Sequence, residues 1–240
     1  MSSKQSQLIS KVLSPAVKVW LRSQVQQVSN LEVKISGSDR HIVGGHIPQV
    51  SISAKGAVYQ GLHLSQIQLV AESIRINLGQ VLRGQPLRLM EPVPVFSELL
   101  LLEADLNASL QAPILATALT EFLVKLLLSG AESDQSALSM TDQLQSWQNP
   151  HIEINAGQLT LSATLETIAG IPKPIVIRTG LKLVSSHELY LEHPQIQTQG
   201  ECCLENRDSF KLDLGTDVAI EELTLTPGQF ICRGRINVIP

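Results

Sequence analysis

Short segments in which every second residue is apolar recur along this chain, and they restrict its possible folds more than any other feature. The clearest are LEVKI at 31–35, VSISA at 50–54, SIRINL at 73–78, QLTLSATL at 158–165, IVIRTGLKL at 175–183, ELYLE at 188–192 and QFICRGRINVI at 229–239. Alternation with a period of two predicts strands that bury one face. Because turns separate most of these segments, we expect an α+β fold with about eight to ten strands, predominantly antiparallel.

Two other segments follow a helical period. Residues 114–128, ILATALTEFLVKLLL, place their apolar residues on one broad face, with Glu121 and Lys125 opposite. A membrane span needs roughly 20 largely uninterrupted apolar residues, so the segment is predicted to be an amphipathic helix of a folded domain and not an anchor. A second helix is expected near the N-terminus, with Ser14 and Pro15 as its cap and first-turn residues.

The two halves of the chain repeat blocks in the same order. NLEVKISG (30–37) matches HIEINAGQ (151–158), GGHIPQVSI (44–52) matches AGIPKPIVI (169–177), and GLHLS (61–65) matches GLKLV (180–184). This order predicts an internal duplication of a helix followed by a meander, with halves at about 8–100 and 101–240 in a single domain of residues 1–240. A mobile polar connection at 129–149, with a short helix around 141–147, is expected between them. One long curved antiparallel sheet would then wrap around the two helices and leave an aliphatic groove wherever side chains do not fill it.

Composition narrows the class of partner. Hydrophobic residues make up 43% of the 240 residues and aromatic residues only 3%, so the apolar interior consists almost entirely of Leu, Ile, Val and Ala. An aliphatic lining suits a lipid chain, and it equally suits an ordinary packed core. The net charge of −4 argues against nucleic acid as a partner, because clustered Lys and Arg supply most of the affinity for nucleic acid.

Familiar catalytic motifs are missing from the sequence. The nucleophile motif Gly-x-Ser-x-Gly, the zinc motif His-Glu-x-x-His and the phosphate-binding motif Gly-x-x-x-x-Gly-Lys do not occur. The three cysteines, Cys202, Cys203 and Cys232, and the scattered histidines have no metal-ligand spacing, and reduced thiols are expected. We therefore expect no enzymatic activity, no cofactor and no bound metal.

Several longer stretches resemble a known family. GLHL at 61–64 and EADLNASL at 103–110 are the most specific pieces of a resemblance that spans about residues 8–238 and includes IRTGLKLVSSHELYLEHPQI at 177–196. They resemble the LmeA-like phospholipid-binding family, whose fold is similar to that of the tubular lipid-binding (TULIP) superfamily. The resemblance implies binding or transfer of phospholipid or another long-chain lipid, without catalysis, in a groove between helix and sheet. The alternative is a fully packed scaffold or interaction protein at a membrane surface, with no lipid ligand.

Two sets of residues are candidates for the lipid site. Apolar residues of the two expected helices would lie nearest the groove: Leu115, Leu119, Phe122, Leu123, Leu126, Val17, Leu21 and Val25. A phospholipid head group needs a cation near the groove mouth. The candidates for head-group or membrane contact are Lys11, Lys18, Arg22, Arg75, Arg83 and Arg88.

The N-terminus has no signal-peptide pattern. The protein is therefore expected in the cytoplasm or peripherally on the inner face of a membrane, with the membrane surface as a partner.

Overall fold

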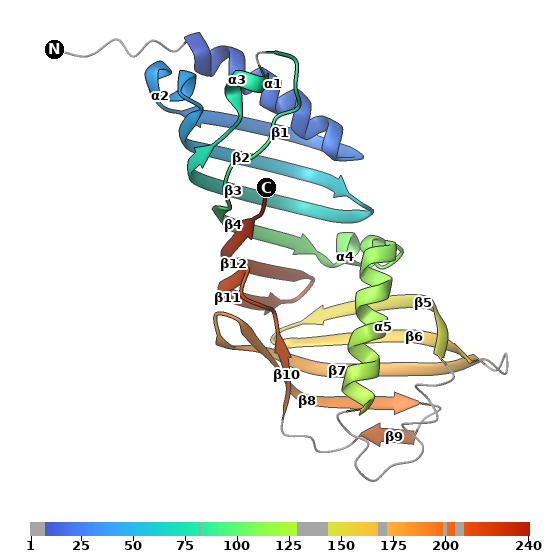
Figure 1. The fold of residues 1–240 in the computed structure, drawn as a ribbon. Coiled ribbons are helices and arrows are strands. Elements are labelled where there is room, and N and C mark those ends of the chain that lie inside the picture. The colour runs from blue at the N-terminus through green and yellow to red at the C-terminus, as the bar shows by residue number, and fades with distance from the viewer. Residues whose placement is uncertain (1–7, 82, 129–143, 168–171, 199–200, 205–208) are drawn as a thin grey trace.

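A computed structural model describes residues 8–81, 83–128, 144–167, 172–198, 201–204 and 209–240 (Figure 1). The helices in this described part are α1 (Leu8–Gln24), α2 (Asp39–Val43), α3 (Leu78–Val81), α4 (Glu103–Ser109) and α5 (Pro113–Leu128). The strands are β1 (Gln27–Ser36), β2 (His46–Tyr59), β3 (Leu62–Arg75), β4 (Val93–Leu102), β5 (Leu144–Asn155), β6 (Gln158–Thr167), β7 (Pro172–Ser185), β8 (Glu188–Thr198), β9 (Glu201–Leu204), β10 (Ser209–Asp213), β11 (Val218–Thr226) and β12 (Gln229–Val238).

The strands form two antiparallel sheets. The first sheet has the order β1-β2-β3-β4-β12-β11, and the second has the order β10-β8-β7-β6-β5, with β9 paired to β8. The expected α+β class with antiparallel strands is confirmed. The strands do not form one long sheet, however, because the chain completes the second sheet and then returns to add β12 and β11 beside β4 of the first.

The helix predicted at 114–128 is confirmed as α5, whereas the start of the first helix is corrected. α1 begins at Leu8, and Pro15 lies inside it. Proline has no N–H, so the Ser14-Pro15 pair interrupts one helical hydrogen bond and does not mark a helix start.

The connection predicted at 129–149 is shorter than expected at its C-terminal end. β5 begins at Leu144, so a strand replaces the C-terminal part of the helix expected around 141–147. Within this strand Trp147 pairs with Leu165 of β6. Residues 129–143 lie outside the described residues.

Helix α4 explains why the second sheet ends at β5. The Glu103 carboxylate accepts a hydrogen bond from the Ile154 N–H at 2.7 Å. The Asn107 side chain accepts one from the Ile152 N–H and donates one to the Ile152 carbonyl oxygen, both at 2.8 Å. Side chains of α4 therefore take the backbone hydrogen bonds of β5 that a neighbouring strand would otherwise take.

The other side of α4 contacts the first sheet. The Ser109 hydroxyl accepts a hydrogen bond from the His63 N–H at 2.7 Å, and the Ser65 hydroxyl donates one to the Asp105 carboxylate. Gly61 has φ of +82°, and a Cβ there would lie 3.0 Å from the Cβ of Ala112, so both its conformation and its surroundings favour glycine. GLHL (61–64) and EADLNASL (103–110) thus meet at a joint between the two sheets, which we call the α4 joint.

Only some of the block matches between the two halves follow the order of the strands. GLHLS at 61–65 and GLKLV at 180–184 fall on β3 and β7, the third strands of the two meanders, but GGHIPQVSI at 44–52 leads into β2, whereas the described part of its match, 172–177, opens β7. The sequence of elements does recur, because α1 precedes the meander β1 to β4 and α5 precedes the meander β5 to β8.

Candidate functional site

One face of the first sheet is almost entirely apolar. Residues directly opposite one another on neighbouring strands point to the same face, so the strand register defines rows across the sheet. Three successive rows across its six strands are Leu31-Ala54-Ile67-Leu99-Cys232-Leu223, Val33-Ile52-Leu69-Ser97-Gly234-Ile220 and Ile35-Val50-Ala71-Val95-Ile236-Val218. These eighteen residues, which we call the apolar face, include a single hydroxyl side chain, that of Ser97.

The middle of the apolar face is only half covered. α1 packs along the edge strand β1, and its Leu21 contacts the cluster around Leu31. Leu87 and Leu89 cover the end of the face near Val95. Between these regions a further group of apolar side chains remains half-buried: Ile52, Ile67, Leu69, Leu99, Leu223 and Cys232. Continuous apolar surface of this kind is a usual sign of a binding site.

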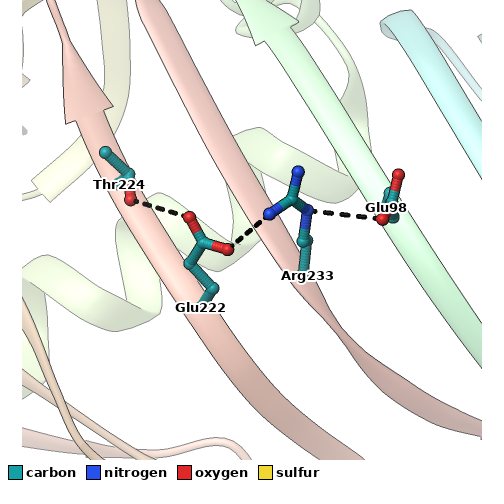
Figure 2. Close-up of polar contacts among 4 residues, drawn as sticks. All are labelled: Glu98, Glu222, Thr224 and Arg233. Atoms are coloured by element: carbon teal, nitrogen blue, oxygen red, sulfur yellow. Dashed lines mark hydrogen bonds and ion pairs between the residues drawn. The ribbon is translucent and has the colours of Figure 1, made fainter.

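The opposite face of the same sheet is polar along its centre, although Val70 and Phe96 pair on that face as well. Its central row is Glu32-Ser53-Gln68-Glu98-Arg233-Glu222. In Figure 2 the Arg233 guanidinium lies between Glu222, at 2.7 Å, and Glu98, at 3.4 Å. Exposed ion pairs add little stability, but this row marks the face as the one that meets water.

The second sheet is covered by α5, which lies across its strands (Figure 1). Leu123 and Leu126 are fully buried at 0% exposure in the cluster that includes Ile175 and Ile196. A second group on α5 is half-buried against the same cluster: Leu115, Leu119 and Phe122. The candidates Val17 and Leu21 on α1 are half-buried as well. Val25 was expected on the same helix but lies just beyond its end at Gln24, where it is also half-buried. Contact of any of these residues with a lipid remains a prediction.

The candidate cations lie on two groups of elements. Lys11, Lys18 and Arg22 are carried by α1, where Arg22 is exposed. Arg75, Arg83 and Arg88 lie between the end of β3 and the start of β4, and all three are exposed.

Arg83 borders an open pocket of about 400 Å³, whose lining also includes Val43, Gly45, Asn77 and Met90. The side chain of Asn77 is fully engaged, because its amide donates to Pro86 and Gln80 and its oxygen accepts from the Arg88 N–H. Of the three candidate arginines, Arg83 lines this pocket, whereas Arg75 does not and forms an ion pair with Glu91 at 3.6 Å.

Cys232 occupies the middle of the apolar face, between Leu99 of β4 and Leu223 of β11. Burial raises the pKa of the Cys232 thiol. The thiol is therefore protonated at neutral pH and behaves as a small apolar side chain.

The described residues show neither a metal-binding cluster nor a membrane-spanning helix. Among them no three His, Cys, Asp or Glu side chains are grouped so that they could hold a metal ion. No helix in this part of the chain is long and apolar enough to cross a bilayer.

The residues predicted from the sequence for the lipid site lie mainly on the helices, and none but Arg75 belongs to a strand of the first sheet. β4 (VPVFSELLLL) and β11 (VAIEELTLT) were not among the expected strands. The LTLT alternation of β11 was a usable signal. No local signal shows that β12 pairs with β4, more than a hundred residues earlier in the chain.

The fold and this face define a class of antiparallel α+β protein with two sheets. A helix lies across one sheet, and the apolar face of the other is only half covered. A model of the LmeA-like phospholipid-binding family matches residues 4–235, so the chain belongs to that family. No curated protein and no solved structure matches it.

Proposed function

We propose that this protein binds a phospholipid or another long-chain lipid with the acyl chain on the apolar face of the first sheet, and that it carries the lipid without changing it chemically. The observation that carries this proposal is the set of three apolar rows whose middle residues are half-buried in the described structure. Membership of a phospholipid-binding family supports a lipid as the ligand.

The physical basis is the removal of acyl methylenes from water. Each buried methylene contributes about 0.8 kcal/mol, so a chain that covers the middle of the face gains several kcal/mol. Aliphatic side chains without rings conform to a flexible chain and select weakly among acyl lengths. The binding is therefore expected to depend on chain burial more than on a particular head group.

The tubular arrangement of the TULIP superfamily is part of this proposal. The recurrence of a helix followed by a four-stranded meander supports an ancestral duplication. The α4 joint supports the view that the two halves work as one domain, because Asn107 and Ser109 tie one short helix to both sheets. In this proposal α1 and the first sheet form the open seam, while α5 and the second sheet form the closed one.

Two neighbouring residues on opposite faces of β3 provide the test. Leu69 belongs to the apolar face, and Val70 points to the polar side, where it pairs with Ser51 and Phe96. Both are half-buried. Leu69→Gln is expected to weaken uptake of a fluorescent phospholipid about tenfold or more, whereas Val70→Gln leaves uptake near the parent value. Ile220→Gln on β11 serves as a second variant, since it alters the same face on another strand.

Uptake is measured by fluorescence titration, and bound lipid by mass spectrometry of organic extracts from the purified protein. Equal uptake by the Leu69 and Val70 variants would exclude the apolar face as the site. Absence of lipid in extracts, together with no uptake by the parent protein, would instead favour the packed-scaffold alternative.

A further inference from the structure

The end of the molecule farthest from the second sheet carries apolar side chains that the fold leaves exposed. Figure 1 shows α1, α2 and α3 gathered at this end. Val19 and Trp20 on α1, Val43 on α2, and Met90 are between 44% and 69% exposed. α1 packs against α2, and Val43 of α2 lines the same pocket as Met90, so the elements that carry these side chains are neighbours. We call α1, α2, α3 and the segment 83–90 the helical end.

The helical end is basic in an otherwise acidic chain. Residues 8–24 and 76–90 contain no Asp or Glu, and in α2 the single acidic residue, Asp39, is next to a basic one, Arg40. The whole chain, by contrast, has a net charge of −4. The basic residues of 8–24 and 76–90 are Lys11, Lys18, Arg22, Arg83 and Arg88. The charge at this end is therefore complementary to an anionic surface.

The mixture of exposed apolar and basic side chains favours an anionic bilayer over nucleic acid as the partner of the helical end. Nucleic acid offers no apolar phase for Val43 and Met90 to enter. A bilayer with anionic lipids offers both an apolar boundary and a layer of phosphates, and a Trp ring is well suited to the level between them. Arg83 is exposed and lines the same pocket as Val43 and Met90, so its guanidinium is available to the phosphates of a bilayer that those two side chains enter.

We propose that the helical end docks on an anionic phospholipid bilayer, with Val19, Trp20, Val43 and Met90 entering the interface and with Arg22 and Arg83 contacting lipid phosphates. This inference goes beyond the proposed lipid carriage, because docking requires no lipid to leave the bilayer. It says which surface of the protein faces the membrane, whereas the proposed function says where an acyl chain is bound.

Sedimentation of the full chain with vesicles tests the docking. The vesicles are phosphatidylcholine alone, or phosphatidylcholine mixed with phosphatidylserine. The parent protein is expected to bind the mixed vesicles more tightly, and to lose that preference at high salt, since screening weakens contacts between exposed charges. Val43→Asp combined with Met90→Asp is expected to weaken binding about tenfold or more. The matched control is Val184→Asp on β7, which is 49% exposed but belongs to the second sheet.

The charge contribution is tested with a second pair of variants. Arg83→Glu is expected to weaken binding to mixed vesicles at least about fivefold, because each basic residue near an anionic surface contributes a factor of this size. Lys182→Glu on β7, also an exposed basic residue, is the control and is expected to change binding little. In a Trp147→Phe background Trp20 is the remaining tryptophan, and its emission is expected to shift to the blue when mixed vesicles are added.

The outcomes separate docking from lipid carriage. Docking is overturned if the Val43/Met90 variant binds vesicles as well as the Val184 control, or if Trp20 emission does not change. Vesicle binding by a parent protein that takes up no fluorescent phospholipid would support docking and contradict carriage. Uptake of monomeric fluorescent phospholipid without any vesicle binding would contradict docking and leave carriage standing.

Discussion

At the scale of single residues, Cys232 is a suitable probe of the apolar face, because it lies in the middle of that face. Its neighbours across the strands are Leu99 and Leu223, and burial raises the pKa of its thiol. An unfolded thiol ionises near pH 8.5, whereas the folded one ionises at higher pH. Its contribution to the free energy of unfolding is therefore fully present below about pH 8.5 and is lost as the pH rises through the folded value.

This shift predicts slow alkylation of Cys232. In a Cys202→Ser, Cys203→Ser background, we expect N-ethylmaleimide to react with Cys232 at pH 7 at least about tenfold more slowly in the folded protein than in urea, because the thiolate is the reactive form and the thiol is partly covered. Bound phospholipid should slow the reaction further. The rate is followed by intact-protein mass spectrometry. Equal rates in buffer and in urea would show that Cys232 is freely accessible.

Gly234 shows how a single residue shapes the same face. A Cβ on Gly234 would lie 2.4 Å from the Ala219 carbonyl oxygen, at the point where β11 shifts register between Ile220 and Glu222. Glycine is required there by the close approach of the β11 backbone. The shift lets Glu222 reach Arg233 on the polar face while Leu223 stays on the apolar face.

At the scale of helices and strands, α4 is the element that divides the strands into two sheets. Asn107 is its central residue, since its side chain bonds both the N–H and the carbonyl of Ile152 and also the carbonyl of Glu103. Without this helix the edge of β5 would present open backbone groups.

Removal of the Asn107 side chain is therefore expected to destabilise the protein. Asn107→Ala should lower the free energy of unfolding by about 1–3 kcal/mol, because the Ile152 backbone groups lose their partners in a half-buried site. Urea denaturation measures the change. Asn30→Ala, at an exposed position of β1, is the control and should stay within about 0.5 kcal/mol of the parent. Similar losses in both variants would contradict the role of the α4 joint.

Helix α5 provides a second comparison, between its two faces. Leu123 is fully buried against the second sheet, and Ile114 on the same helix is 52% exposed. Leu123→Ala is expected to lower the free energy of unfolding by about 2–5 kcal/mol through the cavity it creates. Ile114→Ala should cost less than about 0.5 kcal/mol. Both are measured by urea denaturation, and a small loss in the Leu123 variant would mean that α5 is not firmly packed on the sheet.

At the scale of the whole molecule, the two halves differ in what covers their sheets. α5 lies across the second sheet and buries its apolar side chains, while α1 lies along the edge of the first and leaves the middle strands half covered (Figure 1). The two sheets therefore differ in how far a helix covers their apolar side chains.

This difference predicts one bound phospholipid per chain, although a duplication would suggest two. Native mass spectrometry with excess phospholipid measures the stoichiometry. Leu69→Gln should abolish the single bound lipid, and Leu119→Gln on α5 should leave it in place. A second lipid that is lost in the Leu119 variant would show that the seam under α5 also opens.

Much of the local structure follows from short-range pattern. The period-two segments at 31–35, 50–54, 158–165 and 175–183 all lie in strands, and the helical period at 114–128 lies in α5. These patterns are reliable because alternate side chains of a strand face opposite sides, whatever the neighbouring strand is. The prediction of a strand at 73–78 was only partly correct, because β3 ends at Arg75 and α3 begins at Leu78.

In the strands that alternate, the polar and apolar faces could thus be predicted from the order of the residues, and GLHL and EADLNASL indicated the family. β4, with VPVFSELLLL, does not alternate and was not predicted. The arrangement of the faces could not be predicted in this way. The apolar face exists only because β12 pairs with β4 and β11 follows it, which places Cys232 and Leu223 beside Leu99. Such pairing depends on the backbone hydrogen bonds and packing of segments far apart in the chain, and on α4 occupying the edge of β5. The residue pattern determines which side of a strand is apolar. Long-range packing determines which strands pair to form one apolar face, and which apolar face remains only half covered.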